Sequence, residues 1–180
     1  MLKLYHCPNA RSMRSLWLLY ELDVEFELIE MPFDQKYTRS PEYLAVHPLG
    51  RVPCIIHNDI TLYESGAICQ YLCEVFDKED KLGRSINHQE HTEWLQWLHY
   101  AETIAVHGAS LVQQNIIIAE DLRSPVVIKL ESRRLEKALE VLNNHLKGRK
   151  YLLKSGFSAI DTSVGYSIHM GSMFINISEF

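Results

Sequence analysis

The hydrophobic period of this chain changes once, near residue 80, and this change limits the folds that the chain can adopt. Before it, short β-rich runs alternate with amphipathic segments, and after it apolar residues recur every three or four positions, as they do in α-helices. The order of elements predicts an α/β unit followed by an all-helical one. In the first part we expect strands at 2–5, 25–30, 52–56 and 60–62 and helices at 12–22, 42–46 and 64–76.

Three helical segments are expected after a charged linker at residues 77–87. The first contains Trp97, the second spans about 125–146, and the third begins at Ser158. Asp161 follows Ser158 at the spacing of a capping box, in which the serine side chain accepts from the backbone and the aspartate accepts in return. The third helix therefore has a well-defined start.

Charge and composition exclude several classes of protein. The 180 residues have a formal net charge of −5, whereas phosphate recognition needs clustered Lys and Arg, so we expect no nucleic-acid partner. No apolar run approaches the roughly 20 residues that span a bilayer, and the N-terminus lacks the apolar core of a secretory signal. We therefore expect a soluble, cytoplasmic protein with no membrane partner. The four cysteines form no CxxC pair and the nine histidines lack metal spacing, which predicts reduced thiols and no metal site.

The stretch from Pro48 to Cys54 has the features of a backbone edge that binds a peptide. Pro53 stands at the head of a strand, where it cannot donate a ladder hydrogen bond. If the Val52–Pro53 bond is cis, the amide and carbonyl of Val52 face outward. An extended peptide could then pair with Val52 as an added strand. The alternative for this segment is a plain β-turn.

Glu64 and Ser65 stand at the start of an expected helix, where free backbone amides and the positive end of the helix dipole attract a carboxylate. The Ser65 hydroxyl would complete this anion site, and Glu64 could bind an adjacent ammonium group. The alternative is a plain helix cap. An extended peptide beside Val52 with a zwitterionic head at Ser65 describes a small peptide, and glutathione fits this description.

The two segments, HPLGRVP at 47–53 and ESGAI at 64–68, together resemble the pattern NPxGxVPxL…(E/Q)SxAI of the cytosolic glutathione transferase superfamily, with His47 in place of the usual Asn. FSAID at 157–161 is similar to the capping motif of the family's helical domain. The resemblance is to bacterial-type members, and it implies a thioredoxin-like glutathione-binding domain at 1–80 and a helical domain at 86–180. It also implies a homodimer that conjugates glutathione, as a co-substrate and without a cofactor, to a small hydrophobic electrophile.

The group that ionises the glutathione thiol is expected at the start of the first helix, because helix N-termini and hydrogen-bond donors stabilise thiolates. Serine-type relatives have their serine just ahead of an Arg-Ser pair, and that place is Ala10 here. The start Cys7-Pro8 resembles omega-type transferases and glutaredoxins, which implies that Cys7 forms a mixed disulfide with glutathione and catalyses thiol-disulfide exchange. The alternative is an inert cysteine that packs beside the first strand.

Other side chains in the same region could stabilise the thiolate without forming a covalent bond. The candidates are Tyr5, Ser12, Asn9 and Arg11. Alternatively, Tyr5 points into the core, Ser12 serves only as a helix cap, and Arg11 and Arg14 are ordinary solvated residues. Which group activates the thiol is open at this point.

Two further sets of residues are candidates for binding the glycine carboxylate of glutathione and the electrophile. Lys36 and Arg51 could meet the glycine carboxylate of glutathione, although surface charges often need no partner. The electrophile pocket could be lined by the first helix of the helical domain, although aromatic residues at helical spacing favour a core interpretation. The residues of this possible lining are Trp97, Tyr100, His107 and Val112.

Relatives continue for several helices after the one capped by Ser158, whereas this sequence ends at Phe180. We therefore expect a shortened helical domain in which Val164, Ile168 and Met170 are partly exposed. Because of the short helical domain and Ala10, a noncatalytic glutathione-binding protein is a third hypothesis.

Overall fold

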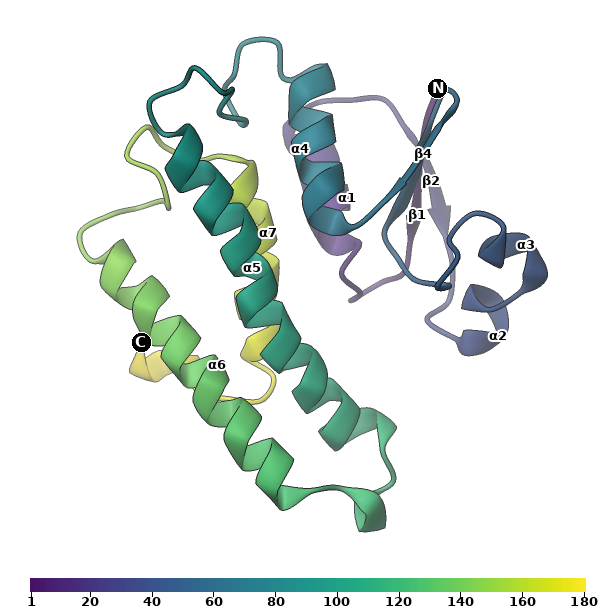
Figure 1. Ribbon diagram of the computed structural model, residues 1–180, viewed down its shortest axis with the longest axis vertical. Helices are drawn as coiled ribbons and strands as arrows, with labels where there is room; N and C mark the ends of the chain where they lie inside the picture. Colours follow the sequence, from purple (N-terminus) through teal and green to yellow (C-terminus); the bar gives the residue numbers. More distant parts are fainter. The chain divides into compact units, whose positions relative to one another are not determined.

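The computed structural model describes the backbone of residues 1–180 and every side chain except that of Glu179. The chain divides into two compact units, Met1–His88 and Gln89–Phe180 (Figure 1). None of the described helices combines the length and the hydrophobicity that crossing a bilayer requires.

A four-stranded mixed sheet forms the centre of the first unit (Figure 1). The strand order is β2-β1-β3-β4, with β2 parallel to β1, β3 antiparallel to β1, and β4 antiparallel to β3. This topology, together with the helical second unit, confirms the expected fold class of a thioredoxin-like α/β domain plus an all-α domain. The strands are β1 (Leu2–His6), β2 (Glu27–Glu30), β3 (Cys54–His57) and β4 (Ile60–Tyr63).

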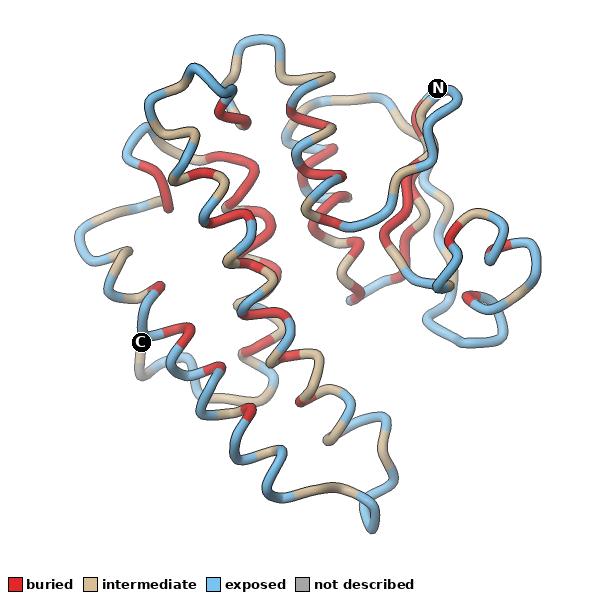
Figure 2. Tube along the Cα trace, in the orientation of Figure 1, coloured by how far each residue is buried: buried red, intermediate tan, exposed pale blue. Residues whose placement is uncertain are grey.

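Helices α1 (Met13–Glu21) and α4 (Ser65–Phe76) pack against each other on one face of this sheet (Figure 1). Burial alternates along β1, so that Leu4 faces these helices and is completely buried. Leu18 of α1 and Leu72 of α4 are also completely buried. Within this unit, Figure 2 shows buried residues along β1, α1 and α4. This apolar layer holds the starts of the two helices in place.

Two short helices connect β2 to β3, where the sequence predicted only one, at 42–46. They are α2 (Gln35–Thr38) and α3 (Pro41–Leu44). The side chain of Asp34 accepts a hydrogen bond from the Lys36 amide at 2.9 Å and so caps α2. Ser40 caps α3 in the same way. A four-residue helix has too few residues to show a hydrophobic period, so only its cap marks it in the sequence.

The second unit consists of three main helices, α5 (His91–Val112), α6 (Pro125–Leu146) and α7 (Ala159–Gly171), and α5 contacts both others. α6 has the bounds predicted from the sequence, because its apolar period and its cap, Ser124, are local features. The shorter elements are the π-helical turn η1 (Gln113–Ile117), the 3-10 turn η2 (Glu120–Leu122) and the 3-10 turn η3 (Ile177–Glu179).

The expected exposure of α7 is wrong for one of the three residues named. Ile168 and Met170 are half-buried, but Val164 is only 2% exposed. The reason is close packing of α7 on α5, where Ser167 donates a hydrogen bond to the carbonyl of Ala101 at 3.2 Å. The small residues of α5 allow this approach and cover the face of α7 that contains Val164.

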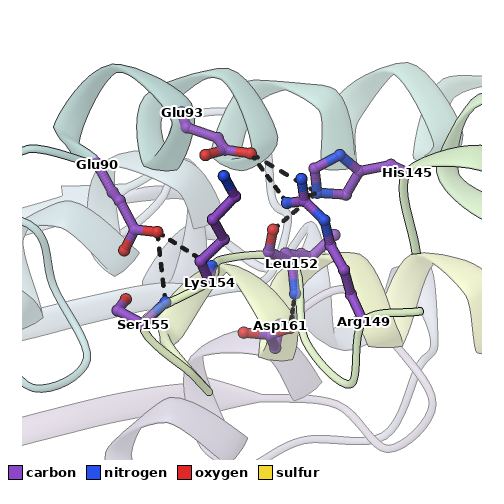
Figure 3. A network of polar contacts seen from close by, with 8 residues as sticks. All are labelled: Glu90, Glu93, His145, Arg149, Leu152, Lys154, Ser155 and Asp161. Atoms are coloured by element: carbon purple, nitrogen blue, oxygen red, sulfur yellow. Dashed lines mark hydrogen bonds and ion pairs between the residues drawn. The ribbon is translucent and has the colours of Figure 1, made fainter. Parts of the chain in front are cut away.

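Polar contacts tie the segment between α6 and α7 to the start of α5 (Figure 3). Glu90 accepts hydrogen bonds from the amides of Lys154 and Ser155, at 3.0 and 3.3 Å. Asp161 accepts from the amide of Ser158 at 2.8 Å, which forms the predicted capping box, and from that of Leu152 at 3.1 Å. One aspartate therefore both starts α7 and fixes the preceding loop.

Candidate functional site

The strand register brings four segments that are distant in sequence to one end of the sheet. Tyr5 pairs with Cys54, and Cys54 pairs with Tyr63, so the residues after β1 and β4 and those before β3 lie at the same end. His6 lies opposite Glu30 in the parallel pair, which places the chain after β2 there as well. The four segments are 7–12, 31–36, 51–53 and 64–65, and apart from Tyr5 they contain all the residues predicted to bind glutathione or to activate its thiol.

The Val52–Pro53 bond is cis, the condition under which we expect the Val52 backbone to face outward. Strand pairing of β3 begins only at Cys54, so Val52 lies outside the ladder. Within the described part of the chain its amide and carbonyl make no hydrogen bond. The preceding Arg51 is exposed, and its carbonyl accepts a hydrogen bond from the Tyr43 hydroxyl at 2.6 Å. The Val52 backbone is therefore open to pairing with an extended peptide.

Gly50 fixes the turn that leads into this segment. Its φ of +56° lies in the left-handed region, and a Cβ added there would stand 2.1 Å from the carbonyl oxygen of Thr38, the last residue of α2. Only glycine fits such an approach. The turn and α2, which contains Lys36, are consequently packed directly against each other.

Helix α4 begins with a strained residue and without a side-chain cap. Glu64 has a φ of +75°, which is uncommon for a residue other than glycine and occurs often at functional sites. Among the described side chains none caps this helix, whose first intrahelical bond is donated by Ile68 to the Glu64 carbonyl. Glu64 is exposed, whereas Ser65, the first helical residue, is buried. The start of α4 can accept an anion.

Arg14 is a residue of the candidate site that sequence reasoning missed. The sequence left it as an ordinary solvated residue, but it is only 2% exposed, and its Nη1 donates a hydrogen bond to Ser65 Oγ at 3.0 Å. A signal was present: Arg14 stands one turn before Leu18, on the helical face that the period predicts to be buried. Its partner is 51 positions away, which no local pattern reveals.

Ser12 is bonded within the loop between β1 and α1 and does not cap α1 with its side chain, which corrects the predicted cap. The side chain is completely buried, and its Oγ lies 2.8 Å from His6 Nδ1. The same oxygen accepts from the amide of Cys7 and donates to the carbonyl of Cys7, each at 3.2 Å. A hydroxyl engaged in this way organises the loop and is not presented to a substrate.

Cys7 does not have the surroundings of a reactive thiol. It is completely buried, and its Sγ lies 3.8 Å from the carbonyl oxygen of Pro32. Burial, and secondarily the negative charge of Glu30, raise the pKa of the Cys7 thiol above its usual value. Reactive cysteines have the opposite character, an exposed thiol with a lowered pKa. The structure therefore favours the inert interpretation of Cys7 over the nucleophilic one.

The remaining candidates for thiol activation differ in their exposure. Tyr5 lies in a central strand, half-buried, with its ring 5.4 Å from that of Tyr43. Arg11 is half-buried in the loop. Asn9 is exposed at the tip of the loop, with a φ of +59° that asparagine tolerates better than most residues. Asn9 is thus the most accessible neutral donor, and the exposed Lys36 lies in the segment after β2.

The residues considered for an electrophile pocket belong to the core of the helical unit. Trp97 is 3% exposed and packs on Tyr100, with ring centroids 5.1 Å apart. The Tyr100 hydroxyl donates to the carbonyl of Ala138 on α6 at 3.0 Å. His107 Nδ1 lies 2.7 Å from a carboxylate oxygen of the buried Glu131, also on α6. These contacts join α5 to α6 and support the core interpretation, whereas Val112 is half-buried at the end of α5.

Comparisons with known proteins agree with this architecture. Residues 1–74 match the family model described as Glutathione S-transferase, N-terminal domain. Glutathione S-transferase 1 of Schizosaccharomyces pombe is 31% identical over 164 residues, which cover 88% of this chain and 70% of the relative. Glutathione S-transferase F10 of Arabidopsis thaliana is 31% identical over 167 residues, which cover 89% of this chain and 76% of the relative.

A solved structure with the same fold is that of the glutathione transferase URE2P6 from Phanerochaete chrysosporium, in complex with oxidized glutathione. It superimposes with a TM-score of 0.84 at 25% sequence identity and covers 99% of this chain and 83% of its own. On these relationships the chain belongs to the glutathione S-transferase family of enzymes, and its sheet topology agrees with this.

Proposed function

We propose that this chain conjugates the thiolate of glutathione to small hydrophobic electrophiles. The main support is the strand register, which gathers the open Val52 backbone, the start of α4 and the loop with Asn9 at one end of the sheet. The URE2P6 structure was solved with oxidized glutathione, which supports a tripeptide site on this fold. Disulfide exchange through Cys7 is not favoured, because its thiol is buried.

In the proposed complex, the cysteinyl backbone of glutathione pairs with the amide and carbonyl of Val52 as an added strand. The α-carboxylate of the γ-glutamyl group binds at the Ser65 hydroxyl and the backbone amides at the start of α4, and the adjacent ammonium binds Glu64. Lys36 and Arg51 are exposed and can meet the glycine carboxylate. Each charged group of the tripeptide then has a partner.

The side-chain amide of Asn9 would donate a hydrogen bond to the sulfur, and Arg11 would add positive charge from the same loop. Both favour the ionised thiol and lower its pKa. The thiolate attacks the electrophilic carbon, a carbon–sulfur bond forms, and the leaving group departs with the electron pair of its bond. The thiol proton passes to solvent. The reaction needs no cofactor.

By its relation to the family we also propose that the chain forms a homodimer and acts in the cytoplasm on toxic electrophiles. Sedimentation at several protein concentrations tests the dimer directly.

The proposal is tested by glutathione titration and by conjugation to a generic aryl halide, with Asn9→Ala as the diagnostic variant. We expect Asn9→Ala to lower kcat about 10- to 100-fold and to raise the pKa of the bound thiol, read from thiolate absorbance. Asn58→Ala is the matched control, because Asn58 is also exposed with a φ of +54° but lies in the β3–β4 turn, at the other end of the sheet. An absence of glutathione binding in the wild type would refute the proposal.

A further inference from the structure

The ring of His6 is linked to the loop that contains Asn9 through the hydroxyl of Ser12. His6 is the last residue of β1 and is 3% exposed, and its Nδ1 lies 2.8 Å from Ser12 Oγ. The same oxygen accepts from the amide of Cys7 and donates to the carbonyl of Cys7, each at 3.2 Å. A completely buried hydroxyl thus joins the end of a central strand to the loop that follows it.

These three contacts determine which nitrogen of His6 carries the proton. A hydroxyl has one proton to donate and two lone pairs that accept. The Cys7 amide can only donate and takes one lone pair, whereas the Cys7 carbonyl can only accept and takes the proton. A lone pair remains for His6, so Nδ1 must be protonated and must donate to Ser12. Burial lowers the pKa of His6, against the opposing effect of the Glu30 charge, so near neutral pH the ring is uncharged with its proton on Nδ1.

The Cys7 carbonyl holds the turn that contains Asn9. It also accepts from the Ala10 amide at 3.2 Å, which closes the turn Cys7-Pro8-Asn9-Ala10. Pro8 at the second position and Asn9 at the third, with a φ of +59°, are the features of a type II turn. A carbonyl has two lone pairs, so the amide and the hydroxyl can bond it together. The direction of this carbonyl, and with it the place of Asn9, therefore depends on Ser12.

We propose that His6 is a positioning residue for thiol activation: by donating to Ser12 from Nδ1, it fixes the turn that presents Asn9 to the sulfur of glutathione. This inference rests on the proposed function, in which the amide of Asn9 donates to the sulfur. His6 is buried and contacts neither substrate in the proposed complex. Its effect is on the place of the donor, where an error of about 1 Å can reduce a rate by up to about 100-fold.

The test uses two substitutions that imitate different nitrogens of the ring. The amide of asparagine lies where Nδ1 lies in histidine and can donate to Ser12, whereas the longer glutamine places its amide near the position of Nε2. We expect His6→Gln to lower kcat for a generic aryl halide about tenfold and to raise the pKa of the bound thiol, read from thiolate absorbance. Its dissociation constant for glutathione should stay within about threefold of the wild type's, and His6→Asn should keep kcat within about threefold.

A purely structural role of His6 predicts a different result. Both substitutions remove the packing of the ring, so both would then lower kcat alike. His57→Gln is the matched control, because His57 is also the last residue of a strand and its Nδ1 lies 2.7 Å from the Tyr71 hydroxyl, but it stands at the other end of the sheet. This control should keep the wild-type kcat and the wild-type pKa of the bound thiol.

A double substitution shows whether His6 acts through Asn9. In the Asn9→Ala background, His6→Gln should lower kcat by less than about threefold, because the donor that it positions is already absent. The inference is overturned by a full tenfold loss in that background, by equal losses of kcat in His6→Gln and His6→Asn, or by a wild-type kcat and thiol pKa in His6→Gln. If His6→Gln does not fold, Ser12→Ala replaces it, since it removes the same bond from the other partner, and a wild-type thiol pKa there is equally decisive.

Failure of the proposed function would give other results. A wild type that binds no glutathione refutes the proposed function, and an unchanged kcat in Asn9→Ala refutes the part of Asn9 in it. If Asn9→Ala lowers kcat and His6→Gln does not, only the positioning role of His6 fails.

Discussion

The backbone amide of Leu49 donates a hydrogen bond to Nδ1 of His47 at 3.2 Å. Asparagine side chains commonly make the same bond to the amide two residues ahead. His47 therefore takes over the turn-forming role open to the asparagine that the family pattern has at this position. Its ring is buried and packs 4.7 Å from that of Tyr63, so the histidine adds a contact to the end of β4.

We predict that His47→Asn destabilises the protein by less than His47→Leu does. Asparagine preserves an acceptor for the Leu49 amide and loses only the ring packing, which should cost about 1 kcal/mol. Leucine fills the site but leaves that amide unpaired, at a cost of about 2 kcal/mol. Urea unfolding of the three proteins measures both values. Equal losses for the two variants would contradict the assigned hydrogen bond.

Stability should decrease as the pH falls below neutrality. Burial lowers the pKa of His6 and of His47 below the ordinary value of 6.5. Between the lowered pKa and 6.5 the unfolded chain binds more protons than the folded one, so the free energy of unfolding rises with pH in this window. Stability from these groups is fully present above about pH 7.5 and is lost as the pH falls through 6.5 toward the folded pKa.

Urea unfolding at intervals from about pH 5 to about pH 8 checks this sign. His47→Asn should remove the part due to His47 and leave that of His6, so its profile should be flatter than the wild type's. A profile as steep as the wild type's would show that His47 does not contribute.

Cys7→Ala should leave conjugation nearly unchanged. Because the thiol is buried and burial raises its pKa, it contributes packing and no nucleophile. We expect kcat/KM within about threefold of the wild type and a stability loss of about 1 kcal/mol. Aryl-halide kinetics and disulfide-reduction assays on both proteins measure this. Loss of disulfide reduction with glutathione binding retained would revive the thioltransferase hypothesis.

Gly50→Ala should be strongly destabilising, and Gly66→Ala should not. A Cβ at Gly50 would stand 2.1 Å from the Thr38 carbonyl oxygen at a φ of +56°, so the backbone must shift. We expect a loss of about 3 kcal/mol. Gly66 lies in α4 with nothing within 4 Å of its added Cβ, and alanine is the better helix former, so a gain of up to about 1 kcal/mol is expected. Similar losses for both glycines would refute the close approach to Thr38.

Asp161→Ala should destabilise the helical unit by about 2 to 3 kcal/mol, because it leaves the amides of Ser158 and Leu152 without their acceptor. Asp121→Ala is the control, since Asp121 is exposed in η2, and it should change stability by less than about 0.5 kcal/mol. Thermal unfolding followed by circular dichroism compares the two. An equal effect of both substitutions would mean that the capping box adds no stability.

Sequence reasoning succeeded where the cause of a structure is local. The bounds of α6, Pro125–Leu146, follow from its apolar period, and the start of α7 follows from the spacing of Ser158 and Asp161. The short helix α2 was not predicted, because four residues are too few to show a hydrophobic period. The pattern around Val52 predicted the candidate peptide edge, although the register that joins it to other segments was not visible in the sequence.

By itself, the sequence determined the order of the strands and of the longer helices, the family and the residues available for a glutathione site, because periodicity, caps and motifs depend on neighbours a few positions apart. Only the tertiary structure decided which of these residues are exposed and which are buried. It buried Cys7 and Ser12, left Asn9 exposed, and set Arg14 against Ser65. The physical reason is that burial and the partners of a polar group are set by the packing of α1 and α4 on the sheet, which joins residues more than fifty positions apart.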